Sequence, residues 1–125
     1  MDVRIITPGI PDKPLIYKVT RSYYAGLAAE GVRIYEYTPG FIHSKQMVCD
    51  DEVAVVGTIN MDFRSLYLHF ENACWFAKYR AVLAVRHDFE TLFPVCREVT
   101  EKYRQKRSLA LWGWECILRM FSPLM

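Results

Sequence analysis

Apolar and polar positions follow two different periods along the chain, and its first third shows both. Residues 3–7 are a β-branched run closed by Pro8-Gly9, which predicts a buried strand. Between residues 15 and 29 apolar side chains recur at helical spacing, and Gly31 stands where a helix-terminating glycine belongs. Residues 32–37 then alternate Val, Ile and Tyr with charged residues, as a strand does. This order of strand, helix and strand predicts a βαβ unit whose two strands run parallel.

The middle of the chain predicts a second group of strands. Residues 41–49 alternate in hydrophobicity and residues 53–56 are wholly apolar, with Asp50-Asp51 between them. Two strands joined by so short a turn predict a β-hairpin. Residues 72–78 predict another strand. Combined with the βαβ unit, these strands predict an α/β fold class with a mixed β-sheet flanked by helices on both faces.

Helical spacing returns in the last third of the chain. Residues 85–96 predict a helix that Pro94 should kink or shorten, and Thr100 is expected to cap a further helix. If residues 108–125 are helical, most of their surface is apolar and includes two tryptophans. Such a helix either lies in a membrane interface or packs on a protein surface, so the segment is treated as an amphipathic tail behind a lobe of residues 1–107.

Composition narrows the classes of protein and of partner. The chain has 125 residues, enough for one domain with a real core, and a formal net charge of +2, which does not demand nucleic acid. Basic side chains cluster locally in residues 97–107. The four cysteines stand far apart, so neither a zinc site nor a disulfide framework is expected. The N-terminus has no signal-peptide pattern, and no run approaches the roughly 20 apolar residues that cross a bilayer.

The candidate chemistry begins with His43 and Lys45, which lie two residues apart on a predicted strand and therefore on one face. An ammonium beside an imidazole suits a phosphate ester, because Lys45 can hold a nonbridging oxygen while its charge favours a neutral, nucleophilic histidine. Thr58 and Asn60, again two apart, offer a hydroxyl and an amide to the same phosphate. Glu71 opens the next predicted strand and supplies a carboxylate that can accept a hydrogen bond from the far nitrogen of His43.

Each of these features alone has an ordinary explanation. A His-x-Lys pair on a strand is most often part of a solvated face, and a Gly-Thr-x-Asn stretch is equally often a turn. Their joint spacing is what favours a site. The positions that make up this single register are His43, Lys45, Asp50, Gly57, Thr58, Asn60 and Glu71.

Residues 43–65 (HSKQMVCDDEVAVVGTINMDFRS) resemble the signature of the phospholipase D superfamily, H-x-K-x(4)-D-x(6)-G-[ST]-x-N, and match it at every fixed position. The continuation at residues 60–65, the opening VRIITPGIPDKP and the closing FSPLM are similar to the bacterial cardiolipin synthase branch. The resemblance covers nearly the whole chain, as the C-terminal lobe of such a synthase. It implies one phospholipase D-like lobe that carries one of two catalytic motifs.

The resemblance also implies a role for each matching residue. His43 would be the nucleophile or its general-acid partner, with Glu71 orienting it. Lys45 and Asn60 would bind the phosphate, with Thr58 beside them. The implied reaction is phosphatidyl transfer, which makes cardiolipin from phosphatidylglycerol through a phosphohistidine intermediate.

Asp50 belongs to the motif but stands at the predicted turn, where a mainly structural role is expected. No metal and no other cofactor is expected, because Lys45, Asn60 and their counterparts would neutralise the charge that develops on the phosphate. The implied partners are a phospholipid substrate, phosphatidylglycerol, and a membrane surface, at the cytoplasmic face of the cell membrane. No nucleic acid is expected.

The chain departs from the family pattern because it has a single His-x-Lys pair. Family members place two such motifs across a pseudo-twofold axis, one histidine attacking and the other donating a proton. Neither His69 nor His87 has a lysine two residues on, so neither is expected to be the second histidine. The chain alone is therefore expected to be inactive or nearly so.

The missing half of the site has two possible sources. The second lobe belongs either to the same, longer chain, which we favour, or to a homodimer mate. The alternatives to a synthase are a phospholipase D-type phosphodiesterase or nuclease active as a homodimer, and an inactive truncated lobe.

Overall fold

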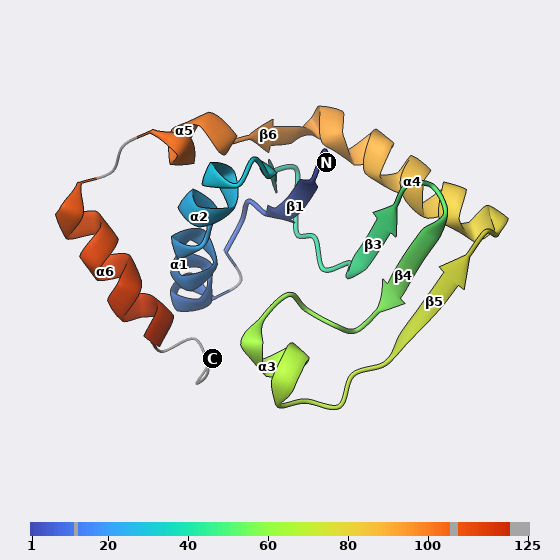
Figure 1. Cartoon of the computed structure of the whole chain (residues 1–125), viewed down its shortest axis with the longest axis horizontal. Helices are drawn as coiled ribbons and strands as arrows, with labels where there is room; N and C mark the ends of the chain where they lie inside the picture. The colour runs from blue at the N-terminus through green and yellow to red at the C-terminus, as the bar shows by residue number, and fades with distance from the viewer. Residues whose placement is uncertain (12, 106–107, 121–125) are drawn as a thin grey trace. The chain divides into compact units, whose positions relative to one another are not determined.

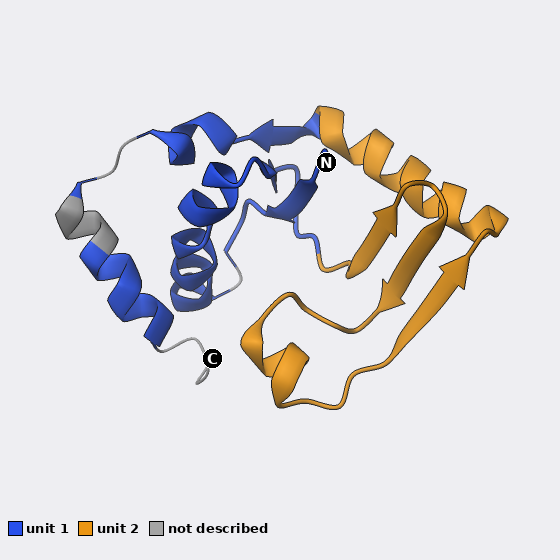
Figure 2. Cartoon of the chain, viewed as in Figure 1, with its two compact units in different colours: residues 1–42, 95–125 blue, residues 43–94 orange. Residues whose placement is uncertain are grey.

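A computed structural model describes residues 1–11, 13–105 and 108–120 of the chain, with only the backbone of residues 109–112. The chain divides into two compact units (Figure 2). Unit 1 comprises residues 1–42 and 95–125, and unit 2 comprises residues 43–94.

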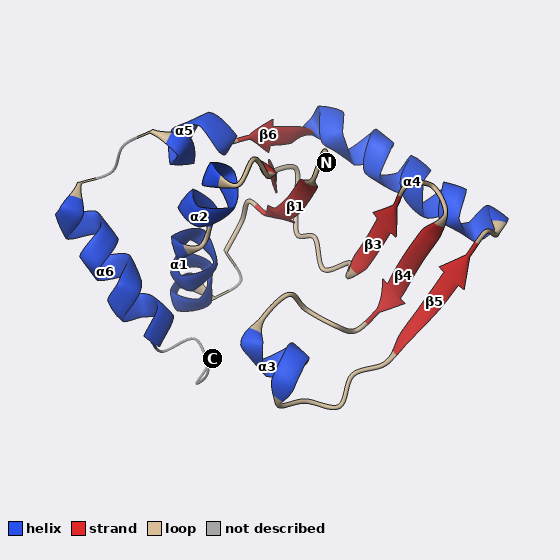
Figure 3. Ribbon diagram, in the orientation of Figure 1, coloured by secondary structure: helices blue, strands red, loops and turns tan. Residues whose placement is uncertain are grey.

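Unit 1 is built on a sheet in the order β1-β2-β6, with strands β1 (Arg4–Pro8), β2 (Arg33–Tyr37) and β6 (Cys96–Glu98) (Figure 3). β1 and β2 pair in parallel, which confirms the predicted βαβ unit, and β6 pairs antiparallel with β2. The helices of the unit are α1 (Pro14–Ser22), α2 (Tyr24–Ala29), α5 (Thr100–Arg104) and α6 (Leu109–Met120). The single helix predicted before β2 is interrupted at Tyr23, and Gly31 after it has the positive φ of 87° that favours glycine.

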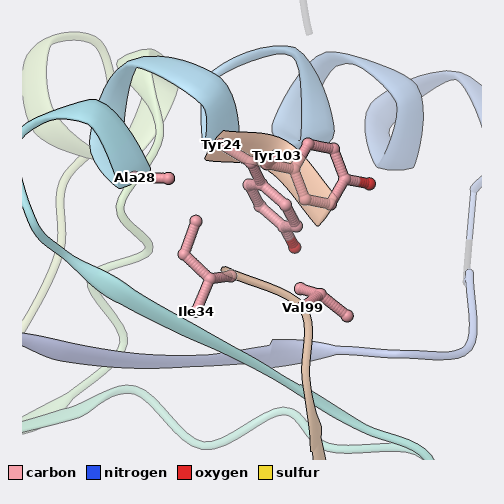
Figure 4. Close-up of a cluster of buried hydrophobic side chains, with 5 residues drawn as sticks. All are labelled: Tyr24, Ala28, Ile34, Val99 and Tyr103. Carbon is pink, nitrogen blue, oxygen red and sulfur yellow. The ribbon is translucent and has the colours of Figure 1, made fainter. Parts of the chain in front are cut away.

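The apolar core of unit 1 joins α2 and α5 to the sheet (Figure 4). Its buried side chains are Tyr24, Ala28, Ile34, Val99 and Tyr103. The rings of Tyr24 and Tyr103 pack edge to face with their centroids 5.0 Å apart. Burial raises the pKa of Tyr24 to about 12, and its hydroxyl is hydrogen-bonded to the Thr7 hydroxyl at 2.7 Å. The buried phenol therefore has a polar partner on β1.

A carboxylate lies in the interior of unit 1 as well. The Glu36 side chain on β2 is fully buried and accepts hydrogen bonds from Arg21 on α1 and from Arg97 on β6. The distances are 2.9 Å from Arg21 Nε to Glu36 Oε1 and 2.7 Å from the Arg97 guanidinium to Oε2. A buried carboxylate needs both its charge matched and its oxygens bonded, and the two arginines supply both.

The C-terminal part of unit 1 differs from the sequence prediction at two places. Residues 96–98 form β6 and not the end of a helix, because the preceding helix ends at Leu92 and Pro94 follows in a 3-10 turn. Thr100 is the first residue of α5 and does not cap it. Its hydroxyl accepts a hydrogen bond from the Ile34 amide at 2.9 Å, so its polar group is used to join α5 to β2.

The apolar C-terminal segment is helical over residues 109–120, as predicted, while residues 121–125 lie outside the described part. α6 packs on α1 (Figure 1): Leu118 is buried, and Arg119 donates to the carbonyl of Ser22. Among its described side chains, the exposed apolar ones are Trp114, Ile117 and Met120. One side of the helix thus contacts protein and another is open. In the described part of the chain, every helix is too short or too polar to cross a membrane.

Unit 2 holds an antiparallel sheet in the order β3-β4-β5, with β3 (Gln46–Cys49), β4 (Val53–Gly57) and β5 (Ala73–Ala77). The predicted hairpin is confirmed. Its turn residues Asp50 and Asp51 have positive φ angles of 49° and 58°, and the Glu52 amide donates to the Cys49 carbonyl at 3.0 Å. These are the features of a type I′ turn, which matches the twist of the two strands.

Two helices and a short turn complete unit 2: α3 (Phe63–Tyr67), α4 (Arg80–Leu92) and the 3-10 turn η1 (Phe93–Val95), which runs into unit 1. α4 begins five residues before the predicted helix, so His87 lies within it and not at its start. α4 covers one face of the sheet. The core on that face consists of Val48, Ala54, Val56, Phe76, Val82, Val85 and Phe89.

The other face of the unit 2 sheet carries a cross-strand row. Strand register places Met47, Val55 and Trp75 side by side, and all three point away from the α4 face because side chains alternate along a strand. Trp75 is 66% exposed and Met47 is exposed as well. This face therefore presents large apolar side chains to solvent.

The α/β fold class is confirmed. The strands form two three-stranded sheets, one mixed and one antiparallel, where a single mixed sheet was expected. The division into a lobe of residues 1–107 and a tail of residues 108–125 stays a prediction.

Candidate active site

The predicted phosphate-binding residues gather at one end of the β3–β4 hairpin in unit 2. Lys45 immediately precedes β3, and its carbonyl accepts a hydrogen bond from the Gly57 amide at 3.1 Å, so the ladder extends one pair beyond the strand. Thr58 follows Gly57 and forms two bonds with Asn72: its amide donates to the Asn72 carbonyl at 2.9 Å, and its Oγ1 accepts from the Asn72 amide at 3.0 Å. Lys45 and Thr58 therefore lie at the same end of the sheet.

His43 lies in the loop before β3 and not on a strand, because β3 begins only at Gln46. The prediction that His43 and Lys45 lie on one strand, and for that reason on one face, was therefore wrong. The two residues are joined in another way, since Lys45 Nζ donates to the His43 carbonyl at 2.8 Å. An ammonium has three donors, so this bond leaves capacity for a phosphate oxygen. His43 itself is exposed.

Gly57 is required by the close approach of β5. A Cβ at this position would lie 2.3 Å from the Asn72 carbonyl oxygen and 2.6 Å from the Ala73 Cα, and both are backbone atoms that cannot easily move aside. Glycine therefore lets the ends of β4 and β5 meet directly beside the cluster of Lys45 and Thr58.

A hydroxyl and a carboxylate meet where the chain returns from α3 to β5. Thr58 Oγ1 donates to Glu71 Oε2 at 2.5 Å. The hydrogen bonds from Thr58 and from Ser65 lower the pKa of Glu71, because they stabilise its charged form. The positive charges of His69 and Lys45 lower that pKa further. Glu71 is therefore a carboxylate at neutral pH, in the field of the Lys45 ammonium.

Helix α3 holds one of these hydroxyls in position. Asp62 caps the helix, with its Oδ1 accepting a hydrogen bond from the Ser65 amide at 2.7 Å. Ser65 is buried, and from there its side chain bonds Glu71. Residues 63–67 thus form a short helix that holds Ser65 beside Glu71.

Asp50 lies at the opposite end of the hairpin. It stands five residues beyond Lys45, which at roughly 3.3 Å per residue is about 16 Å along the strand. Its carboxylate accepts a weak bond from the Cys49 thiol at 3.4 Å, and this raises the pKa of that thiol. The adjacent Asp51 binds Arg86 of α4 at 2.6 Å. Asp50 thus lies in the hairpin turn, as predicted, and its mainly structural role stays a prediction.

The structure thus brings Lys45, Thr58 and Glu71 together, and Asn60 follows in the exposed loop two residues after Thr58. His43 stands two residues before Lys45. The orientation of His43 by Glu71 stays a prediction, because the Glu71 bonds described above come from two hydroxyl groups.

The electrostatic contribution of His69 was missed by the sequence reasoning. His69 lies in the bend after α3, and its charge helps to lower the pKa of Glu71. The signal that could have found it is its position two residues before Glu71, inside the same loop. The search for a lysine two residues further on tested only whether His69 repeats the catalytic motif.

The cysteine, histidine and acidic side chains decide whether the described residues could hold a metal ion. All four cysteines are free thiols. Within residues 1–11, 13–105 and 108–120, no three His, Cys, Asp or Glu side chains are grouped so that they could hold a metal ion.

The chain is similar in sequence to known proteins of one family. Residues 1–93 match the family model described as cardiolipin synthase, phospholipase D-like domain. Over 125 residues the chain is 36% identical to a cardiolipin synthase of Halalkalibacterium halodurans and 38% identical to one of Geobacillus sp. (strain WCH70), and it covers 25% of each. It is 40% identical to an uncharacterized protein of Streptococcus mutans, of which it covers 27%. The chain thus spans about a quarter of the length of these relatives. No solved structure gave a significant match.

Proposed function

The chain belongs to the family of cardiolipin synthase phospholipase D-like domains, and on that premise we propose that it supplies one catalytic half-site of a phosphatidyltransferase. The reaction joins two molecules of phosphatidylglycerol into cardiolipin and releases glycerol. The observation that carries the proposal is the cluster of the Lys45 ammonium, the Thr58 hydroxyl and the Glu71 carboxylate at the end of the hairpin, next to His43.

His43 is the proposed nucleophile. One imidazole nitrogen attacks the phosphorus of the first phosphatidylglycerol, so an N–P bond forms while the P–O bond to the terminal glycerol breaks. The leaving oxygen takes a proton from the histidine of the second motif. That histidine then takes the proton of a hydroxyl on a second phosphatidylglycerol, whose oxygen displaces the His43 nitrogen from phosphorus.

Lys45 and Asn60 are proposed to bind the nonbridging phosphate oxygens. Lys45 supplies a positive charge, and Asn60 supplies N–H donors without further charge. With their counterparts in the second motif they would stabilise the charge of the transition state, so the proposed mechanism uses no cofactor. A hydroxyl has one proton to donate, and that of Thr58 goes to Glu71, so the proposed part of Thr58 is to hold Glu71 beside the phosphate.

Glu71 is proposed to orient His43. The hydrogen bonds that lower the pKa of Glu71 keep it charged, and a charged carboxylate can accept the N–H of His43 and stabilise the imidazolium. Asp50 is proposed to act through the turn of the hairpin, since it lies at the far end of β3.

The second motif is proposed to come from a longer chain that contains this lobe, because the chain spans about a quarter of its relatives. A homodimer mate is the other source. The lipid substrate implies work at a membrane surface, proposed to be the cytoplasmic face of the cell membrane, and the exposed side of α6 is one candidate contact.

The test compares the chain alone with the chain joined to the complementary lobe of a cardiolipin synthase relative. Each receives phosphatidylglycerol labelled at its phosphorus, and products are separated after an alkaline quench, which preserves an N–P bond. The joined protein should form labelled cardiolipin and a labelled protein intermediate, and the chain alone should form neither. Release of labelled phosphatidic acid would point to a hydrolase, and activity of the chain alone to a homodimer.

Two histidine variants make this test specific. His43→Ala in the joined protein should lower the rate by at least about a thousandfold and abolish the labelled intermediate. His87→Ala is the matched control, because His87 is exposed on α4, and its rate should be unchanged. Cardiolipin formation by His43→Ala at the normal rate would contradict the proposal.

A further inference from the structure

Large apolar side chains are exposed throughout the loop between Asn60 and Glu71. They are Met61, Phe63, Leu66, Tyr67, Leu68 and Phe70, and together they are called the α3 rim. Tyr67 is 72% exposed and Phe70 is fully exposed. Six exposed apolar side chains within ten residues point to a contact site, since folded proteins normally leave only scattered apolar side chains in water.

The way α3 is anchored explains this exposure. Ser65 lies on the inner side of the helix, buried and bonded to Glu71. With 3.6 residues per turn, the residues two positions before and after Ser65 lie on the opposite side of the helix, so Phe63 and Tyr67 face outward. Their rings pack together with centroids 4.8 Å apart. The helix is therefore held by its polar side and presents its apolar side outward.

Cationic side chains accompany the α3 rim. Arg64 is exposed on α3, and Lys45 lies at the proposed site. The one acid within residues 61–70 is Asp62, and its carboxylate is engaged as the cap of α3. Apolar and aromatic side chains beside cations complement a surface that has anionic groups over an apolar interior.

We propose that the α3 rim docks on an anionic phospholipid bilayer and so delivers a lipid phosphate to the site. The identity of the substrate in this inference rests on the proposed function. A phosphatidyl group keeps its acyl chains in the bilayer while its phosphate must reach Lys45 and Asn60. The α3 rim begins at the residue after Asn60 and ends at the residue before Glu71. If the rim contacts the bilayer surface, the lipid phosphates at that surface therefore lie close to Asn60 and Glu71.

The experiment measures binding of the 125-residue chain to vesicles, without turnover. Vesicles of phosphatidylglycerol mixed with phosphatidylcholine are compared with vesicles of phosphatidylcholine alone. Replacing Leu66, Tyr67 and Phe70 together by serine should lower partition into the anionic vesicles by at least about tenfold. Arg64→Gln should lower it by about fivefold at low salt. Trp75→Ser is the matched control, because it removes an equally exposed aromatic side chain from the sheet face, and its partition should be unchanged.

Two additions keep the test decisive. All variants are also made with Trp114→Ser and Ile117→Ser, so that contact through α6 does not mask the α3 rim. Tyr67→Trp adds a reporter that requires no loss of apolar surface, and brominated lipids should quench its fluorescence beyond the quenching seen in the unsubstituted chain.

Several results would overturn the proposal. These are unchanged binding by the triple variant, an equal loss in Trp75→Ser, equal binding to the two kinds of vesicle, or an unquenched reporter at position 67. If the triple variant binds vesicles normally but no longer associates with the complementary lobe, the α3 rim is a protein interface. If the α3 rim is needed for binding yet the joined protein makes no cardiolipin, the docking stands and the proposed function fails.

Discussion

Units 1 and 2 each combine a three-stranded sheet with helices, but they place their bonded carboxylates in opposite ways. In unit 1, Glu36 lies in the interior, 0% exposed, between the guanidinium groups of Arg21 and Arg97. In unit 2 the core is apolar, and Glu71 stands at one end of the sheet, bonded by two hydroxyl groups. The first charge helps to hold the fold, and the second remains partly exposed to solvent.

The difference lies in the chemistry of the partners. Two arginines cancel the charge of a carboxylate and occupy its oxygens, so Glu36 has nothing left to offer a ligand. Hydroxyl groups lower the pKa of a carboxylate without cancelling its charge, so Glu71 can still act on an imidazolium or an ammonium. A bonded carboxylate is therefore a candidate functional group when its partners are neutral and it lies near the surface.

The largest expected effect comes from breaking the charged interior of unit 1. Glu36→Ala should lower the free energy of unfolding by about 3–5 kcal/mol, because it leaves the partly buried Arg21 without its partner. Denaturant unfolding measures the change. Glu101→Ala removes a surface partner of Arg104 in the same unit and should change stability by less than about 0.5 kcal/mol. Similar losses in the free energy of unfolding for the two variants would show that burial does not determine how much an ion pair contributes to stability.

The next effect concerns the end of the unit 2 sheet. Gly57→Ala should destabilise the protein by about 1–3 kcal/mol, because the new Cβ meets the backbone of Asn72 and Ala73. Gly26→Ala is the control, since a Cβ there meets nothing within 4 Å. Within α2 it should stabilise the protein by about 0.5–1 kcal/mol. Thermal unfolding measures the stability of both variants. An unchanged melting temperature for Gly57→Ala would contradict the close approach of β5 to Gly57.

A smaller effect is expected where unit 2 uses ion pairs on its surface. Arg86 binds Asp51 at 2.6 Å and Glu90 at 2.9 Å, so it has two partners of opposite charge, as Glu36 does. All three side chains are exposed, and Arg86→Ala should therefore lower the free energy of unfolding far less than Glu36→Ala does. The loss should shrink further at high salt in the same unfolding experiment. If Arg86→Ala lowered the free energy of unfolding as much as Glu36→Ala does, the contrast between the buried ion pairs of unit 1 and the exposed ones of unit 2 would be wrong.

The smallest change in stability is expected at Glu71, where it accompanies a shift in the pKa of the carboxyl group. Thr58→Val removes the first hydrogen bond of Glu71, so the pKa of Glu71 should rise toward its ordinary value of 4.5. The pKa of Glu71 is lower in the folded protein than its ordinary value, so this hydrogen bond stabilises the protein at pH values above 4.5. The stabilisation is lost as the pH falls through the lowered pKa. Carbon NMR of the Glu71 carboxyl follows the titration. Thr58→Ser keeps the hydroxyl and should leave the pKa low, and a rise in both variants would assign the shift elsewhere.

Much of the order of elements could be predicted, because it depends on local patterns. The parallel pair of β1 and β2 follows from a helix of suitable length between two β-branched runs, and the β3–β4 hairpin follows from Asp50-Asp51. The buried triad around Glu36 could not be predicted, because Arg21 and Arg97 approach it from α1 and β6, far away in the sequence. β6 itself was missed, since it is a strand only through its pairing with β2.

The candidate site was predictable in composition but not in detail. The motif spacing identified Lys45, Thr58 and Glu71 as neighbours, and they are. It did not indicate that Thr58 donates its hydroxyl proton to Glu71, nor that His43 precedes β3. The direction of a hydrogen bond and the ends of a strand depend on the conformation of the loops. The pattern of apolar and polar residues in the sequence does not predict that conformation.

The closure of the loop at Thr58 and Asn72 has a consequence for how chains of this family change over time. The two residues form a neck, joined by backbone and side-chain hydrogen bonds, from which residues 59–71 project. A segment whose ends are already held together can be lengthened, shortened or exchanged at little entropic cost. On the proposed function, exchange of residues 61–70 between relatives should transfer lipid preference with the segment, while Lys45, Asn60 and Glu71 stay in place.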